Sequence, residues 1–159
     1  MRQLVLLRHA HAETGVAGQA DFDRPLSVEG QAEAEAAGVW LEQHGYRPDR
    51  ILYSPSQRTK ETLERVLAVL GSGVDARPEP RIYEATPGTL MEIADAHRDG
   101  GRVLLVGHNP GLEQMVALLA SGQSGEFRGM PAGAVAVLDL PPDAGLEPGI
   151  AAVSAFWWP

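Results

Sequence analysis

The 159-residue sequence contains no cysteine, one lysine and no apolar stretch near the roughly 20 residues that a membrane-spanning helix needs. Without cysteine the chain cannot form disulfides, use a thiolate nucleophile or build a cysteine-based zinc site. The apolar run at residues 4–7 is too short for the core of a signal peptide. We therefore expect a cytoplasmic protein that does not associate with a membrane.

Positive charge is also scarce, because 21 acidic residues outnumber 13 basic ones and leave a formal net charge of −8. A general nucleic-acid binder needs a basic surface, so we expect no nucleic-acid partner. All the basic residues except Lys60 are arginines, whose planar fork of donors suits phosphate. A GC-rich genome would produce the same bias, so the arginines permit a small cationic pocket without requiring one.

The rest of the composition is ordinary for a folded domain, with 44% hydrophobic and 21% charged residues. A chain of this length buries roughly 68–70% of its unfolded surface, which is enough for a core without disulfides or a structural metal. Domains commonly span about 100–200 residues, so we expect a single domain over residues 1–159.

Segments with the pattern of strands alternate with segments with the pattern of helices along most of the chain. Short apolar or β-branched runs predict strands at residues 3–7, 50–53, 78–83, 102–106, 134–140 and 150–157. Helical spacing and capping residues predict helices at residues 28–43, 57–70, 86–98 and 110–120. This order predicts an α/β fold, a three-layer α/β/α sandwich whose sheet is mainly parallel, with the last two strands as an antiparallel edge pair.

Polar side chains follow three of the predicted parallel strands, at the edge of the sheet where ligands bind in such folds. The first strand is followed by Arg8 and His9, and later strands are followed by Ser54, Arg58, His108 and Asn109. Arginine forks and the N-terminus of the helix after Asn109 suit a phosphoryl group. A neutral histidine there can attack phosphorus and form a covalent phosphohistidine, and nearby arginines help to keep it neutral.

Other hydrolytic and phosphate-transfer chemistries lack their motifs in this sequence. No G-x-x-x-x-G-K-[ST] loop, H-E-x-x-H or paired-aspartate metal motif, or G-x-S-x-G elbow occurs. We therefore expect no metal and no cofactor. Residues 122–133 are expected to form a loop in which Phe127 and Met130 border the site, and His11 is expected to lie behind the site or in solvent.

Three ordered motifs resemble the histidine phosphatase superfamily, also called the phosphoglycerate-mutase-like superfamily. Residues 7–10 resemble its R-H-G signature, residues 54–62 are similar to its S-x-x-x-R-x-x-x-T segment, and residues 106–109 match its second-histidine motif. The resemblance spans residues 4 to about 120 and is closest to the protein phosphohistidine phosphatases of the SixA type. Residues 23–30 resemble their D-x-x-R-P-L-[ST]-x-x-G segment, although Asp21 matches the aspartate spacing better. Ala10 replaces the signature glycine.

The resemblance implies a role for each candidate residue. His9 would be the nucleophile, and Arg8, Arg58 and His108 would bind the phosphoryl oxygens and stabilise the transition state. Glu84 lies near the place of the family's proton donor, and Arg24 would line the mouth of the pocket. Ser54 and Asn109 are further candidate substrate contacts, although Ser54 could serve only as a capping or turn residue.

The segment between Tyr83 and Arg102 has 18 residues, enough for one helix but not for the long insertion that covers the site in mutase-type members. The absence of such a lid favours phosphate displayed on a protein. We therefore expect a monomeric, metal-independent phosphatase whose partner is a phosphohistidine carrier protein. Two alternatives stay open: a phosphatase of small phosphomonoesters, and a non-catalytic phosphate-binding module.

Overall fold

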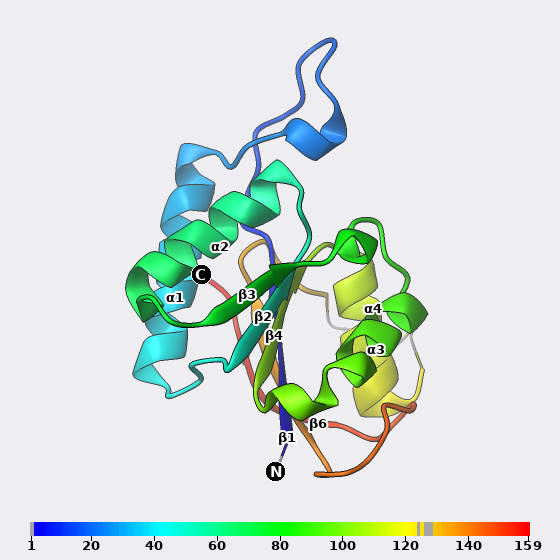
Figure 1. Ribbon diagram of the computed structural model, residues 1–159. Helices are drawn as coiled ribbons and strands as arrows, with labels where there is room; N and C mark the ends of the chain where they lie inside the picture. The colour runs from blue at the N-terminus through cyan, green and yellow to red at the C-terminus, as the bar shows by residue number, and fades with distance from the viewer. Residues whose placement is uncertain (1, 124, 126–128) are drawn as a thin grey trace.

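The computed structural model describes residues 2–123, 125 and 129–159, so the predicted position of Phe127 lies outside the described residues (Figure 1). The strands are β1 (Arg2–Arg8), β2 (Arg50–Tyr53), β3 (Asp75–Pro78), β4 (Val103–Gly107), β5 (Val135–Leu140) and β6 (Ala152–Trp157). The α-helices are α1 (Val28–Gln43), α2 (Gln57–Leu70), α3 (Pro87–Ala96) and α4 (Gly111–Ser121). Short 3₁₀ turns are η1 (Asp21–Asp23), η2 (Pro80–Ile82) and η3 (Arg98–Gly100).

The strands form one six-stranded sheet in the order β3-β2-β4-β1-β5-β6. Strands β3, β2, β4 and β1 are parallel to one another, whereas β5 pairs antiparallel with both β1 and β6. This arrangement confirms the predicted α/β fold with a mainly parallel sheet and an antiparallel edge pair. Because β1 and β4 are adjacent, Arg8 pairs with Gly107, and the residues that follow these two strands emerge side by side.

Helices cover both faces of the sheet, as the alternation of strands and helices predicts (Figure 1). Leu4 and Leu6 of β1 pack with α3 and α4 in one buried cluster. Val5 and Leu7 point to the opposite face and pack with α1 and α2 in a second cluster. All four side chains are at most 1% exposed, which explains why β1 has a continuous apolar run rather than an alternating one.

The third strand differs from the prediction, which placed an extended segment over residues 78–83. Strand β3 instead ends at Pro78, and Pro80 begins η2. The side chain of Glu79 accepts a hydrogen bond from the Arg81 backbone N–H, which caps this turn. Proline fixes φ and lacks an N–H, so it suits the first position of a helical turn better than a strand interior. The predicted helix at 86–98 is also shorter, ending at Ala96 before η3.

The segment between β1 and α1 projects from the end of the sheet (Figure 1). An isolated bridge between Ala12 and Leu26 closes its base, and the Ser27 side chain caps α1 by accepting from the Gly30 N–H at 2.9 Å. A Cβ atom on Gly30 would lie 1.9 Å from the His11 carbonyl oxygen, so glycine is required for this approach. No helix within the described ranges combines the length and apolarity needed to cross a bilayer.

Candidate active site

A cavity of about 640 Å³ opens at the carboxyl ends of the parallel strands, where the sequence predicts the site. Seven of the eight predicted site residues line it, and these are Arg8, His9, Arg24, Arg58, Glu84, His108 and Asn109. Ser54 is fully buried and does not line the cavity. His11, which the sequence places behind the site or in solvent, lies in the cavity wall.

His9 is buried directly after β1 and is oriented by the backbone. Its Nδ1 lies 2.7 Å from the Ala10 carbonyl oxygen, so the neutral ring donates from Nδ1 and leaves the Nε2 lone pair free. Burial lowers the pKa of His9 to about 4 against the opposing effect of that carbonyl, and the positive charges of Arg58 and Arg8 lower it further. His9 is therefore neutral at neutral pH, as a nucleophile requires.

Ala10 fits this position because its Cβ has a place to pack. The side chain is fully buried in a small cluster with Leu26 and Ala34. Its backbone N–H donates to Thr62 Oγ1 at 3.1 Å, and Thr62 in turn donates to the Arg58 carbonyl at 2.8 Å. The loop that carries His9 is thus fixed to the first turns of α2.

The two arginines predicted to bind the phosphoryl group, Arg8 and Arg58, each have one N–H donor that has no hydrogen-bond partner in the described part of the chain. Arg58 donates from Nη1 to the Asp21 carbonyl at 2.8 Å and from Nη2 to Asp21 Oδ2 at 3.1 Å. Arg8 donates from Nη1 to the Met130 carbonyl at 2.8 Å. The Nε atoms of both arginines are buried and have no hydrogen-bond partner among the described residues. Both guanidinium groups are therefore held in place beside the cavity, and each has a buried N–H without a partner among the described residues.

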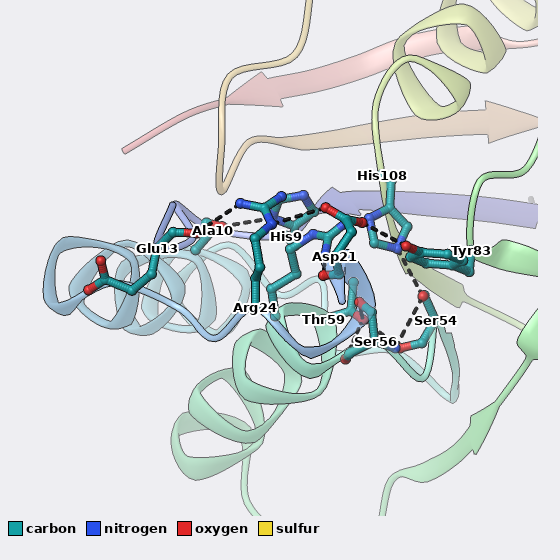
Figure 2. Close-up of polar contacts among 11 residues, drawn as sticks. His9, Ala10, Glu13, Asp21, Arg24, Ser54, Ser56, Thr59, Tyr83 and His108 are labelled. Atoms are coloured by element: carbon teal, nitrogen blue, oxygen red, sulfur yellow. Dashed lines mark hydrogen bonds and ion pairs between the residues drawn. The ribbon is translucent and has the colours of Figure 1, made fainter. Parts of the chain in front are cut away.

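Asp21 is the main site residue that the sequence reasoning did not assign. Its carboxylate accepts from Arg58, from Arg24 Nε at 3.0 Å and from the Tyr83 hydroxyl at 2.6 Å (Figure 2). The Tyr83 hydrogen bond lowers the pKa of Asp21 most, desolvation opposes it, and the contacts with Arg24 and Arg58 add to the lowering, which brings the pKa to about 2. The signal in the sequence was its spacing to Arg24 in the D-x-x-R pattern.

Tyr83 links this carboxylate to the second histidine. Its ring meets His108 edge-on, with ring centroids 5.4 Å apart, and the Arg58 guanidinium lies 5.9 Å from the ring centroid. The hydrogen bond to Asp21 raises the pKa of Tyr83, so the hydroxyl remains a donor. The Tyr83–Asp21 hydrogen bond thereby attaches the projecting β1–α1 segment to the cavity wall, a contact that the hydrophobic periodicity of the sequence does not predict.

His108 lies beside His9 in the cavity wall, with ring centroids 5.2 Å apart. Burial lowers its pKa to about 3, and the proximity of His9 and Arg58 contributes. Its Nε2 lies 2.8 Å from Ser54 Oγ. Ser54 therefore lies behind His108 and contacts that ring, whereas the sequence left it open between a substrate contact and a capping or turn residue.

Asn109 contacts the loop that precedes β5. Its side-chain amide donates to Glu113 Oε2 at 3.1 Å and to the Met130 carbonyl at 2.8 Å. Because Arg8 donates to the same carbonyl, Met130 connects the first and last motifs of the site, and its position beside the site is as predicted. The amide oxygen of Asn109 is buried and has no partner among the described residues.

Glu84 lies at the exposed rim of the cavity with a backbone φ of 57°. Residues other than glycine rarely adopt this left-handed conformation, and such strain concentrates at functional sites. Within the described part of the chain, no group of three histidine, aspartate or glutamate side chains is arranged to hold a metal ion.

Comparison with known proteins agrees with this geometry. A sequence model of the histidine phosphatase superfamily (branch 1) matches residues 4–94. The phosphohistidine phosphatase SixA of Escherichia coli (strain K12) is 30% identical over 128 residues, which are 77% of this chain and 76% of that protein. A solved structure described as a SixA phosphohistidine phosphatase from Agrobacterium tumefaciens has a TM-score of 0.84 at 30% identity, covering 99% of this chain and 98% of that one. The structure of the protein histidine phosphatase SixA with tungstate has a TM-score of 0.82 at 26% identity, covering 98% and 96%.

The matched segment includes Arg8, His9 and Arg58, and the structural matches extend over the second-histidine motif as well. The family and the cavity therefore agree on hydrolysis of a phosphoryl bond, and a role limited to phosphate binding is not supported. The chain belongs to the histidine phosphatase superfamily, where it is similar to the SixA phosphohistidine phosphatases, and it is a phosphatase.

Proposed function

We propose that the protein hydrolyses phosphohistidine on a partner protein, through a covalent phosphohistidine at His9 and without a metal ion. The observation that carries this proposal is the His9 ring: Nδ1 is occupied by the Ala10 carbonyl, and a neutral Nε2 is left free in a ring that is subject to the positive charges of Arg58 and Arg8. The names of the SixA relatives support the substrate class. Tungstate, a tetrahedral oxyanion like phosphate, is bound by one of them.

The proposed reaction has two displacements at phosphorus. His9 Nε2 forms a bond to phosphorus while the bond to the imidazole nitrogen of the substrate breaks, and that imidazole takes up a proton. Water then attacks the phosphorus on His9: an O–P bond forms, the Nε2–P bond breaks, the water loses a proton to solvent, and inorganic phosphate leaves while Nε2 regains its lone pair. Arg8, Arg58 and His108 would donate to the three equatorial oxygens, over which the charge is spread in the transition state.

The remaining predicted residues would supply a proton, attract the substrate or position other residues of the site. Glu84, at the rim, would supply the proton to a leaving group that needs one. Arg24 would attract the phosphoryl group at the mouth, and Asn109 would fix Arg8 through Met130. We further propose that the protein acts as a cytoplasmic monomer and that its partner is a phosphohistidine carrier protein.

A second candidate, hydrolysis of a small phosphomonoester, is favoured by the size of the cavity. Its volume of about 640 Å³ lies within the range of roughly 300–1,000 Å³ that is typical of small-molecule sites. Both candidates use the same nucleophile, so they differ in substrate rather than in mechanism.

The test is to trap the intermediate. The protein is incubated in EDTA with a ³²P-phosphohistidine carrier domain and, separately, with a panel of monoesters, and acid-labile label is mapped by mass spectrometry. We expect label on His9, with at least a 10³-fold loss of turnover in His9→Ala and no loss in the exposed His44→Ala control. Unchanged phosphate release by His9→Ala would refute the mechanism. A higher kcat/KM for one monoester than for the phosphoprotein would favour the second candidate.

A further inference from the structure

The contact between Ser54 and His108 joins two buried groups at the back of the cavity. Ser54 is 0% exposed, and its Oγ lies 2.8 Å from His108 Nε2. Figure 2 shows Ser54 on the far side of the His108 ring from His9. Ser54 therefore does not contact a substrate in the cavity directly, and any effect that it has on the substrate passes through the His108 ring.

The hydrogen-bond partners of Ser54 decide which atom carries the proton. Among the described residues, the partners of Ser54 Oγ are the Ser56 backbone N–H, at 3.4 Å, and His108 Nε2. The Ser56 N–H is itself a donor, so the Ser54 hydroxyl proton has His108 Nε2 as its acceptor. The reverse arrangement would bury the hydroxyl without an acceptor, which costs about 1–3 kcal/mol.

The other ring nitrogen of His108 is left without a protein partner. Nδ1 is buried and has no hydrogen-bond partner among the described residues, although His108 lines the cavity with His9 and Arg58. A neutral imidazole carries one proton. If Nε2 accepts from Ser54, that proton is on Nδ1, where it can be donated to an anionic oxygen.

We propose that Ser54 is a positioning residue that holds His108 as the Nδ1–H tautomer, so that the ring presents a donor rather than a lone pair to the phosphoryl group. The opposite tautomer would direct a lone pair at an anionic oxygen and repel it. The identity of the group that Nδ1 meets rests on the proposed function, but the tautomer itself does not.

The tautomer can be measured in the resting protein without substrate. Long-range ¹⁵N–¹H correlation spectra of histidine-labelled protein at pH 7 distinguish protonated from unprotonated ring nitrogens. We expect a protonated Nδ1 and an unprotonated Nε2 for His108 in the wild type, and a mixture of tautomers in Ser54→Ala. A protonated Nε2 in the wild type, or an unchanged spectrum in Ser54→Ala, would overturn the proposal even if the enzyme is fully active.

Kinetics then separate positioning from a general structural role. Ser54→Ala should lower kcat/KM by about 10- to 100-fold, less than the roughly 10²- to 10³-fold loss on removing a transition-state donor, because the variant can still reach the correct tautomer. Ser56→Ala is the matched control, since Ser56 is equally buried but its hydroxyl contacts Thr59 and not His108. Equal losses in both variants, at equal stability to urea, would assign Ser54 a purely structural role and contradict the proposal.

Discussion

At the scale of single residues, backbone carbonyls organise the site as much as side chains do. The carbonyl of Ala10 orients His9, and the carbonyl of Met130 accepts from both Arg8 and Asn109. A carbonyl oxygen has two lone pairs and no titratable proton, so these contacts persist over the whole pH range. The charged donors are thus held by neutral acceptors, and their charge remains available to a substrate.

Asp21 is the exception, because a carboxylate there competes with an incoming phosphoryl group for Arg58 and Arg24. We predict that Asp21→Asn, which keeps the shape and removes the charge, tightens the binding of inorganic phosphate or tungstate by about fivefold, equivalent to roughly 1 kcal/mol. Isothermal titration at low ionic strength measures this. Asp23→Asn makes the same charge change in the same turn and should have less than half the effect on binding free energy. If Asp21→Asn binds the oxyanion no more tightly than the wild type does, the Asp21 carboxylate does not compete with the phosphoryl group for the arginines.

The sequence motifs identify some residues of the site and not others. Arg8, His9, Arg58 and His108 can be found from the sequence because each follows a buried strand or opens a helix, and parallel strands end at one edge. Asp21 and Tyr83 cannot be assigned in this way, since both lie in irregular segments and meet only through a tertiary contact. Ser54 is left open between a substrate contact and a turn residue; it makes the turn contact with the Ser56 N–H, and its further contact with His108 is not predicted, because the sequence does not reveal whether a side chain faces the cavity or the layer behind it.

At the scale of elements, α1 positions the nucleophile loop through its first turn. The His11 carbonyl accepts from both the backbone N–H and the hydroxyl of Ser27, and the third residue of the helix, Gly30, packs against it. The N-terminal cap of α1 is thus packed tightly against the chain that follows β1, and this packing leaves no room for a side chain at position 30.

We predict that Gly30→Ala destabilises the protein by about 2 kcal/mol or more, because its Cβ would lie 1.9 Å from a backbone oxygen that cannot move alone. Gly88→Ala is the matched control in the first turn of α3, where the nearest atom would be 3.9 Å away. That variant should be neutral or slightly stabilised, since alanine favours helix. Urea unfolding measures both. Comparable stability of the two variants would show that the close approach relaxes without cost.

The elements that the sequence predicts well are those whose burial is strong. Strands β1 and β4 lie at the centre of the sheet and keep continuous apolar runs, so their positions agree with prediction to within one or two residues. Strand β3, with the sequence Asp-Ala-Arg-Pro, is at the sheet edge and mostly exposed. Ala76 is its one side chain packed against the hydrophobic core, so the strand has no apolar run that periodicity could reveal.

At the scale of the whole molecule, the chain has a net charge of −8, yet the arginines Arg8, Arg24 and Arg58 line its cavity. Two histidines with low pKa values, His9 and His108, are buried beside those arginines. Folding therefore removes from water two groups that would bind protons readily in the unfolded chain. The cost of keeping them neutral makes global stability depend on pH.

We predict that the free energy of unfolding falls as the pH drops from 7 to 5. The folded pKa values, about 4 for His9 and about 3 for His108, lie below the ordinary value of 6.5, so in this window the unfolded state binds more protons. Each histidine should contribute a loss of roughly 2 kcal/mol between these pH values. Urea unfolding at both pH values measures the slope, which His9→Gln and His108→Gln should each reduce. The exposed His44→Gln control should keep it, and a wild-type slope in both buried variants would mean that other groups cause the acid sensitivity.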